Sequence, residues 1–184
     1  MSALNIITTD SLRPDHYLGQ GIDLGDKNID FLISQGFPIE RKPTVLIQGS
    51  FLFALKTKIN QHVIGCPQPE QLDDKVIYLV RVQRSKGVPD QSSHLHPICQ
   101  SIIDSSIAQV APSLNQHPPP DPELGRNLFF LLDCEIVGTF AASSDPSNQG
   151  INFSSDVGQI SPAVTYHLFS PDTQVMNTVL NGMV

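Results

Sequence analysis

The chain has 184 residues, of which 40% are hydrophobic and 16% are charged, and its formal net charge at neutral pH is −7. This length and composition suit a globular protein with one well-buried core and argue against a wholly disordered chain. The negative charge opposes binding to polyanions, so neither nucleic acid nor a membrane is expected as a partner. We therefore expect a single domain over residues 1–184.

Cysteine usage and hydropathy bear on the cellular compartment. Cys66, Cys99 and Cys134 are odd in number and widely spaced, and no signal-peptide pattern lies at the amino terminus. This pattern does not indicate secretion, so we expect reduced thiols and a cytoplasmic location. No apolar run approaches the roughly eighteen residues of a membrane span, and the longest candidate is interrupted by Asp133 and Glu135.

The first predicted elements are a strand at residues 3–9, rich in β-branched residues, and a short helix at residues 28–35. The helix is predicted because Ile29, Leu32 and Ile33 have helical spacing and a glycine follows the segment.

Two further apolar stretches predict strands. Residues 44–64 contain two apolar runs around Gly49 and then alternate polar with apolar residues, which favours a hairpin or bulged strand pair. Residues 76–82 are dense in β-branched side chains, which indicates a central strand covered on both faces.

The main helix is predicted at residues 97–111, with Pro97 at its first position. Its apolar stripe consists of Ile98, Ile102, Ile103, Ile107 and Val110. Residues 112–125 then contain five prolines and no apolar periodicity, so we expect an extended surface connection there.

The last third is predicted to form strands at residues 127–132, 134–140, 151–153 and 164–169. A polar turn at residues 142–150 separates them, and a closing helix follows an N-cap at Ser170. Together these elements predict an α+β fold. Its mixed or antiparallel sheet is partly rolled toward a barrel, with the 97–111 helix packed over one face.

The amino-terminal segment places an apolar run directly before Asp10, Asp15 and His16, a layout that delivers polar groups to a sheet edge. Residues 5–37 resemble the amino-terminal strand, turn and helix of the sulfatase branch of the alkaline-phosphatase superfamily. The resemblance implies that Asp10 is a metal ligand. It gives one hypothesis, a divalent-metal hydrolase of phosphate or sulfate esters that uses Asp10, Asp15 and His16.

The same family carries its nucleophile in a Cys/Ser-x-Pro-x-Arg motif, which this sequence does not match. After Cys66, proline stands one position early, and Glu70 occupies the place of the arginine. Cys66 is therefore not predicted to be that nucleophile, and the better interpretation of the aspartates and His16 is that they are ordinary loop residues.

His94, His96 and Cys99 form the one local cluster of softer metal ligands. Two readings give them chemistry: a zinc site completed from elsewhere, or a Cys99 thiolate activated at the start of the helix. The alternative is that His96 caps the helix, His94 is solvated and Cys99 is inert. No phosphate-binding glycine motif occurs, and no cofactor is expected.

The carboxy-terminal third carries a second resemblance, through Gly125 to Asn127 and residues 136–140, 151–157 and 166–171. It resembles the small β-barrel that precedes the motor in HerA-type hexameric ATPases, especially cyanobacterial ones. The resemblance implies a bacterial-type assembly and partner-docking element without catalytic residues. The Walker A motif that follows the barrel in that family does not occur in this sequence.

The favoured hypothesis is therefore a non-catalytic protein-binding or assembly accessory domain, acting on a protein partner or through self-association. Sheet surfaces around Phe129, Phe130, Phe140 and Phe169 are the predicted binding elements, with the alternative that these rings belong to the core.

Overall fold

The structure is a computed structural model that describes residues 16–34, 48–110, 129–142, 151–158, 160–171 and 173–181. Its strands are β1 (Tyr17–Leu24), β2 (Asn28–Ser34), β3 (Phe51–Lys56), β4 (Val76–Lys86), β5 (Phe129–Ala142), β6 (Ile151–Ser154) and β7 (Tyr166–Phe169). Its helices are α2 (His96–Val110), α4 (Thr173–Asn181) and the short 3-10 helix η2 (Pro69–Gln71).

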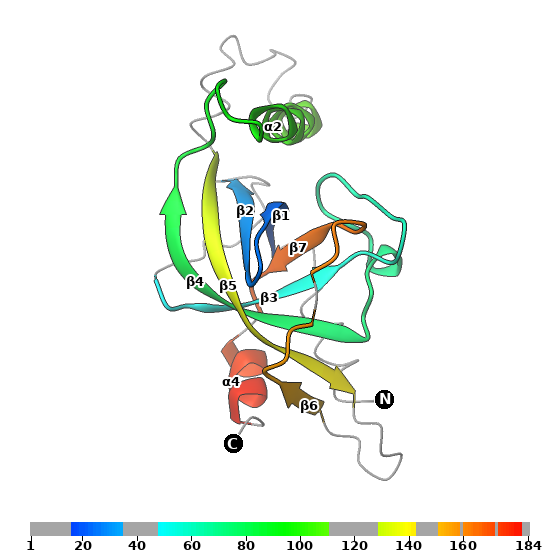
Figure 1. Ribbon diagram of the computed structural model, residues 1–184. Coiled ribbons are helices and arrows are strands. Elements are labelled where there is room, and N and C mark those ends of the chain that lie inside the picture. The colour runs from blue at the N-terminus through cyan, green and yellow to red at the C-terminus, as the bar shows by residue number, and fades with distance from the viewer. Residues whose placement is uncertain are drawn as a thin grey trace.

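The strands form an antiparallel sheet in the order β2-β1-β7-β3-β4-β5-β6. An additional pairing between β2 and β5 closes six of them into a barrel, and β6 extends β5 outside it (Figure 1). The described fold is thus mostly β. The α+β prediction is corrected on this point, although the antiparallel sheet and its tendency to roll into a barrel are confirmed.

The helix predicted at residues 28–35 is wrong, because Asn28–Ser34 forms strand β2. Ile29 and Ile33 share one face of this strand with Phe31 and point into the barrel core. Leu32 is buried on the opposite face in a different cluster, beneath α2. Burial on both faces placed apolar residues at three- and four-residue intervals, which imitated the spacing of a helix.

Strand β4 confirms the prediction of a central strand. It lies between β3 and β5, and Ile77, Tyr78, Leu79 and Val80 are all buried. The hairpin predicted at residues 44–64 is not formed by the described part of that segment, since β3 pairs with β4 and β7 instead. In the described part, from Phe129 on, the two strands predicted at residues 127–132 and 134–140 are one continuous strand, β5.

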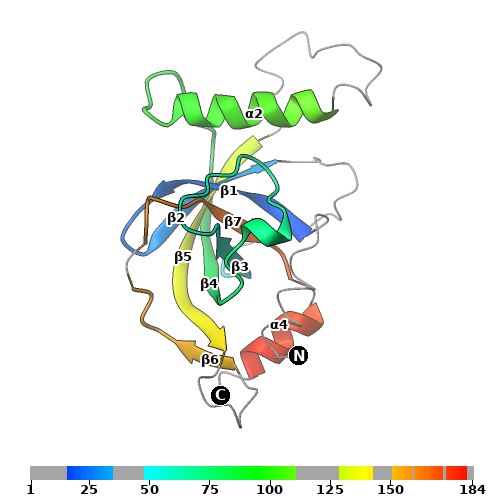
Figure 2. The same cartoon turned by 90° about the vertical axis from the view of Figure 1, so that its right-hand side faces the viewer.

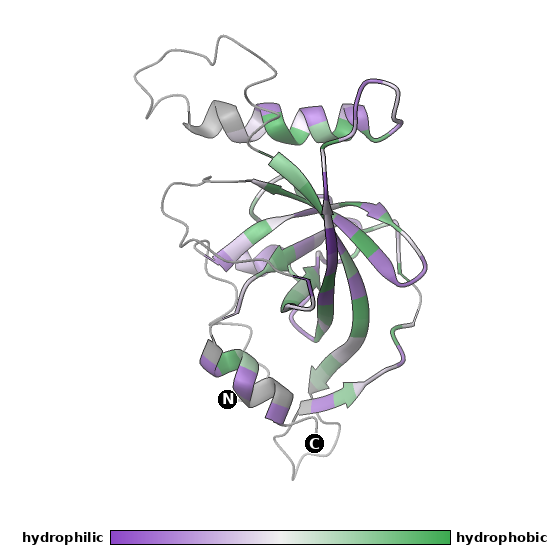
Figure 3. Cartoon of the chain, turned by 90° about the vertical axis from the view of Figure 1, so that its left-hand side faces the viewer, coloured by the Kyte–Doolittle hydropathy of each residue, from purple (hydrophilic) through white to green (hydrophobic). Residues whose placement is uncertain are grey.

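Alternating side chains fill the barrel interior, as expected for a small closed barrel. The interior includes Phe31, Val80, Leu132, Tyr166 and Leu168, each at most 2% exposed. Figure 3 shows the alternation of hydrophilic and hydrophobic residues along the strands. The interior of the barrel is therefore filled by side chains that pack against one another.

Two helices cover different parts of the barrel exterior and lie at opposite ends of the molecule (Figures 1 and 2). Helix α2 packs through Cys99, Ile102 and Ile103 onto Leu32 and Leu131. Helix α4 contributes to a second outer cluster with Val175 and Met176, beside Phe140, Phe153 and Phe169.

The helix at residues 97–111 is confirmed by α2, but its buried stripe differs from the prediction. Ile102 and Ile103 are buried as expected, whereas Ile98 is 42% exposed and Cys99 takes its place in the interface. The strands at residues 151–153 and 164–169 and the closing helix are confirmed, although the helix begins at Thr173 and not directly after Ser170. Residues 3–9, 112–125 and the turn beyond Ala142 lie outside the described ranges. Within those ranges, no helix has the length and apolar character needed to cross a membrane.

Candidate functional site

Of the three residues of the metal hypothesis, the structure places His16. Asp10 and Asp15 lie outside the described residues. His16 is half-buried just before β1, with Nδ1 2.7 Å from the carbonyl oxygen of Ser170, whose backbone nitrogen donates back to the His16 carbonyl. In the part of the chain that is described, no three His, Cys, Asp or Glu side chains come together as a metal site.

His94, His96 and Cys99 are therefore not brought together as a metal site. His94 is exposed in the turn before α2, and His96 begins the helix, half-buried. Cys99 is 1% exposed and packs under the helix with Ile102 and Ile103. The cysteine thus contributes to the attachment of α2 to the barrel.

The four phenylalanines predicted as binding residues lie mainly in the core. Phe129 is 6% exposed beneath α2, and Phe140 and Phe169 are 3% and 0% exposed in the second outer cluster. Phe130 is half-buried against the barrel interior. A partner would have to displace covering elements before it could touch three of these rings.

A chain of buried polar groups runs along the outer face of β7. The Tyr17 hydroxyl donates to the Gly65 carbonyl at 3.1 Å and lies 3.0 Å from Nδ1 of His167. The other ring nitrogen of His167 lies 3.1 Å from the Thr165 hydroxyl oxygen. These contacts are all satisfied by a neutral imidazole that donates from Nδ1 to Tyr17 and accepts at Nε2 from Thr165.

Burial fixes the protonation states of this chain. Burial lowers the pKa of His167 to about 3, because the imidazolium would be removed from water. Burial also raises the pKa of Tyr17 well above its ordinary value, with the neighbouring Cys66 adding to the effect. His167 is 0% exposed and Tyr17 9%. Both groups are therefore neutral and shielded at ordinary pH, an arrangement suited to holding structure.

These groups attach one loop, Thr57–Cys66, to the barrel wall; we call it the 57–66 loop. The amide of Thr57 donates to the Thr165 carbonyl at 2.9 Å, and the Thr57 hydroxyl donates to the Gln61 carbonyl at 2.6 Å. At the other end, the Gly65 amide donates to Oε1 of Gln20, a side chain only 4% exposed. Both ends of the loop are thus fixed by buried or part-buried hydrogen bonds.

The same loop presents large apolar side chains to solvent. Ile59 is 81% exposed and Ile64 is 56% exposed. Between them, Asn60 adopts a positive φ of 64°, the left-handed region that asparagine tolerates better than most residues. Two exposed isoleucines on a loop that hydrogen bonds hold at both ends make this loop a candidate contact surface.

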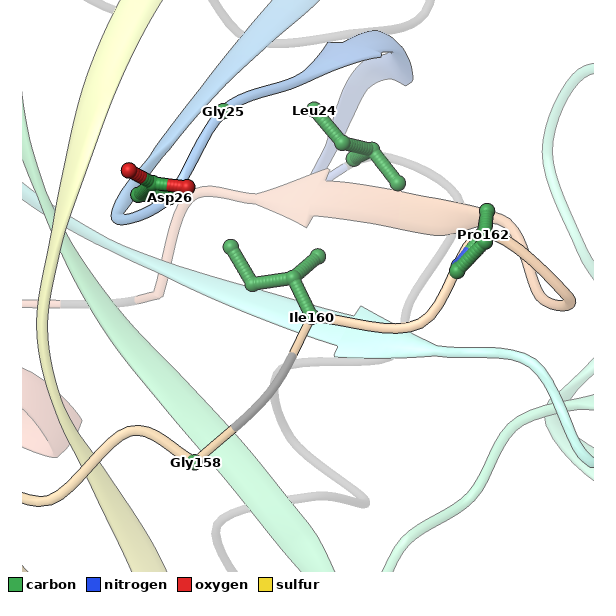
Figure 4. Close-up of a pocket in the computed structure, with 6 residues that line it drawn as sticks. All are labelled: Leu24, Gly25, Asp26, Gly158, Ile160 and Pro162. Atoms are coloured by element: carbon green, nitrogen blue, oxygen red, sulfur yellow. The ribbon is translucent and has the colours of Figure 1, made fainter.

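A cleft of about 540 Å³ lies beside the turn between β1 and β2. Figure 4 shows that Leu24 reaches it from the end of β1 and Asp26 from the turn, while Ile160 and Pro162 reach it from the segment that precedes β7. Its lining combines apolar side chains with one carboxylate and offers no cluster of groups for catalysis among the lining residues.

A charged band crosses the barrel exterior from β2 to β4. Asp30 and Asp133 are directly paired across β2 and β5. Lys86 Nζ lies 3.0 Å from Asp30, and Arg84 Nε lies 3.5 Å from Asp133. The opposing carboxylates are therefore each matched by a cation, which indicates a structural role for the band.

The sequence reasoning missed both the 57–66 loop and the cleft. The alternation from Lys56 to Ile59 was interpreted as strand, although the nearby Asn60 and Gly65, both at positive φ, were a signal of loop.

A scan of the chain against models of protein families and a search of curated proteins each found no match.

Proposed function

We propose that this chain is a non-catalytic protein-binding or assembly accessory domain that acts through the outer surface of its barrel. The observation that carries the proposal is the contrast within the 57–66 loop. Hydrogen bonds at Thr57 and Gly65 hold the loop in place at its two ends, while Ile59 and Ile64 remain 81% and 56% exposed. An exposed isoleucine on a well-fixed loop loses little conformational entropy when a partner covers it.

Two further features support a binding role. Strand β6 pairs with β5 along one edge, and no described strand pairs with its other edge, which leaves backbone groups for an added strand. The resemblance of the carboxy-terminal third to the barrel of HerA-type ATPases also favours an assembly element. Neither feature requires a cofactor.

Site-specific photocrosslinking in the native cell tests the proposal. A photoreactive amino acid at position 64 lies on the exposed loop, and one at Gln91, which is exposed before α2, is the matched control. We expect position 64 to give a defined crosslinked protein, either another protein or a second copy, that position 91 does not give.

Two results would contradict this function. One is the lack of any crosslinked protein specific to position 64. The other is hydrolysis of nitrophenyl phosphate or sulfate by the purified chain that requires a divalent metal and disappears in Asp10→Ala, because this outcome would establish the hydrolase hypothesis instead.

A further inference from the structure

The 57–66 loop differs in charge from the rest of the chain. From Lys56 to Pro69 the sequence contains no carboxylate, and Lys58 stands directly before Ile59. The whole chain nevertheless has a formal net charge of −7. The loop therefore offers an apolar side chain beside a positive charge, and the partner that fits it best has an apolar recess with an acidic group.

The cleft beside the β1–β2 turn has the complementary chemistry. Leu24, Ile160 and Pro162 give it apolar walls, and Asp26 supplies a carboxylate. Lys27 is next in the chain but does not line the cleft. At about 540 Å³ the cleft is larger than one isoleucine side chain.

From this complementarity we infer that the cleft of one copy receives the 57–66 loop of a second copy of this chain. Ile59 enters between Leu24 and Ile160, and the Lys58 ammonium approaches the Asp26 carboxylate. The inference rests on the proposed function and specifies its partner. Each copy carries both a loop and a cleft, so every molecule can give a loop and receive one.

Sedimentation velocity over protein concentrations from about 10 µM to about 1 mM tests the inference, since a contact of this small size is expected to be weak. The wild-type chain should associate. Ile59→Asp should raise the dissociation constant at least about tenfold, since it places a charge at the buried anchor. The matched control is Ile98→Asp, which alters an isoleucine 42% exposed on α2 and should change the constant less than about twofold.

A charge exchange tests the pairing itself. Lys58→Glu and Asp26→Lys should each weaken association, because each places like charges opposite one another. An equimolar mixture of the two variants should recover association, because the altered loop of one then meets the altered cleft of the other. All of these positions are exposed, so the fold should tolerate the changes.

The inference is overturned if the wild-type chain stays monomeric throughout this range, if Ile98→Asp weakens association as much as Ile59→Asp, or if the mixture recovers nothing. These failures are distinguishable from failure of the proposed function. A monomeric chain that still crosslinks a different protein from position 64 would overturn self-association and keep the binding role.

Discussion

The hydroxyl oxygen of Tyr17 lies 3.0 Å from Nδ1 of His167, and this contact joins the start of β1 to β7 beneath the 57–66 loop. The two rings also contact each other, with centroids 5.7 Å apart. Because the same hydroxyl reaches the Gly65 carbonyl, one side chain connects two strands and the loop. We therefore expect the position of the loop end that carries Ile64 to depend on the buried Tyr17 and His167 side chains.

The buried imidazole should make stability depend on pH. Burial lowers the pKa of His167 to about 3 from 6.5, so between these values the unfolded chain binds a proton that the folded chain does not. Stability should then be fully present above pH 6.5 and fall as the pH decreases toward 3. By pH 5 the loss from this one group is about 2 kcal/mol. Urea denaturation at pH 7 and pH 5 measures it.

His167→Gln keeps polar contacts but removes the titration, so its loss of stability between pH 7 and pH 5 should be smaller by that amount. The control is His94→Gln, which alters an exposed histidine and should leave the wild-type pH dependence. An unchanged slope in His167→Gln would refute the assignment.

Removal of the Tyr17 hydroxyl should loosen the loop. Tyr17→Phe keeps the ring packing but leaves the Gly65 carbonyl and His167 Nδ1 without their shared partner. We expect a loss of about 1–3 kcal/mol in the free energy of unfolding, and faster amide hydrogen exchange at Gly65. Tyr78→Phe removes a hydroxyl from the barrel interior and should leave exchange in the loop unchanged. Equal effects of both variants would argue against a local role.

The approach of β1 to β2 requires a glycine. A Cβ atom at Gly19 would lie 2.0 Å from the carbonyl oxygen of Leu32, a backbone atom that cannot move without disturbing the barrel pairing. Gly19→Ala should therefore destabilise the chain by about 3 kcal/mol or prevent folding. Gly87→Ala meets nothing within 4 Å and should be nearly neutral in thermal denaturation. A stable Gly19→Ala variant would show that the strands can separate there.

Removing the charge of Lys86 should lower the free energy of unfolding more than removing the charge of an unpaired lysine, because Lys86 belongs to the charged band. Lys86→Met leaves Asp30 facing Asp133 across the β2–β5 pair with one fewer cation. The Lys86 side chain is 34% exposed, so screening limits the expected cost to about 1 kcal/mol. Adding Asp30→Asn to Lys86→Met should recover most of the lost stability, whereas Lys75→Met should leave the free energy of unfolding unchanged. If Asp30→Asn gives no recovery, the cost does not come from carboxylate repulsion.

Strands β4 and β2 are both buried on both faces, yet the sequence predicted the first and missed the second. Strand β4 was predicted correctly because β-branched residues on both faces left no other interpretation. Strand β2 was missed because Leu32, buried under α2, broke the two-residue alternation of Ile29 and Ile33. Local spacing cannot reveal that a distant helix covers the outer face of a strand.

The candidate site was harder to predict for the same reason. His167 becomes a buried, neutral group only because Tyr17, about 150 positions away, and Thr165 surround it. Ile59 looks like any core isoleucine in the sequence, and its exposure follows from how the loop is attached. The chemistry of Asp26 could be read locally, but its position beside Ile160 required the fold.

Thiol reactivity gives a final test of how the loop end is packed. The Cys66 residue is exposed, yet its sulfur contacts the Pro67 carbonyl at 3.8 Å, and burial raises the pKa of its thiol to about 11 from 9.0. At pH 8 this lowers the thiolate fraction about a hundredfold, so Cys66 should react with a disulfide reagent far more slowly than a small free thiol. Cys99 and Cys134 are at most 1% exposed and should react only after unfolding.

Tyr17→Phe should speed the reaction at Cys66 if the loop end is released, while Tyr78→Phe should not. Rapid reaction of Cys66 in the wild-type chain would mean that the sulfur is open to solvent, and the loop would then be less firmly attached than its hydrogen bonds indicate.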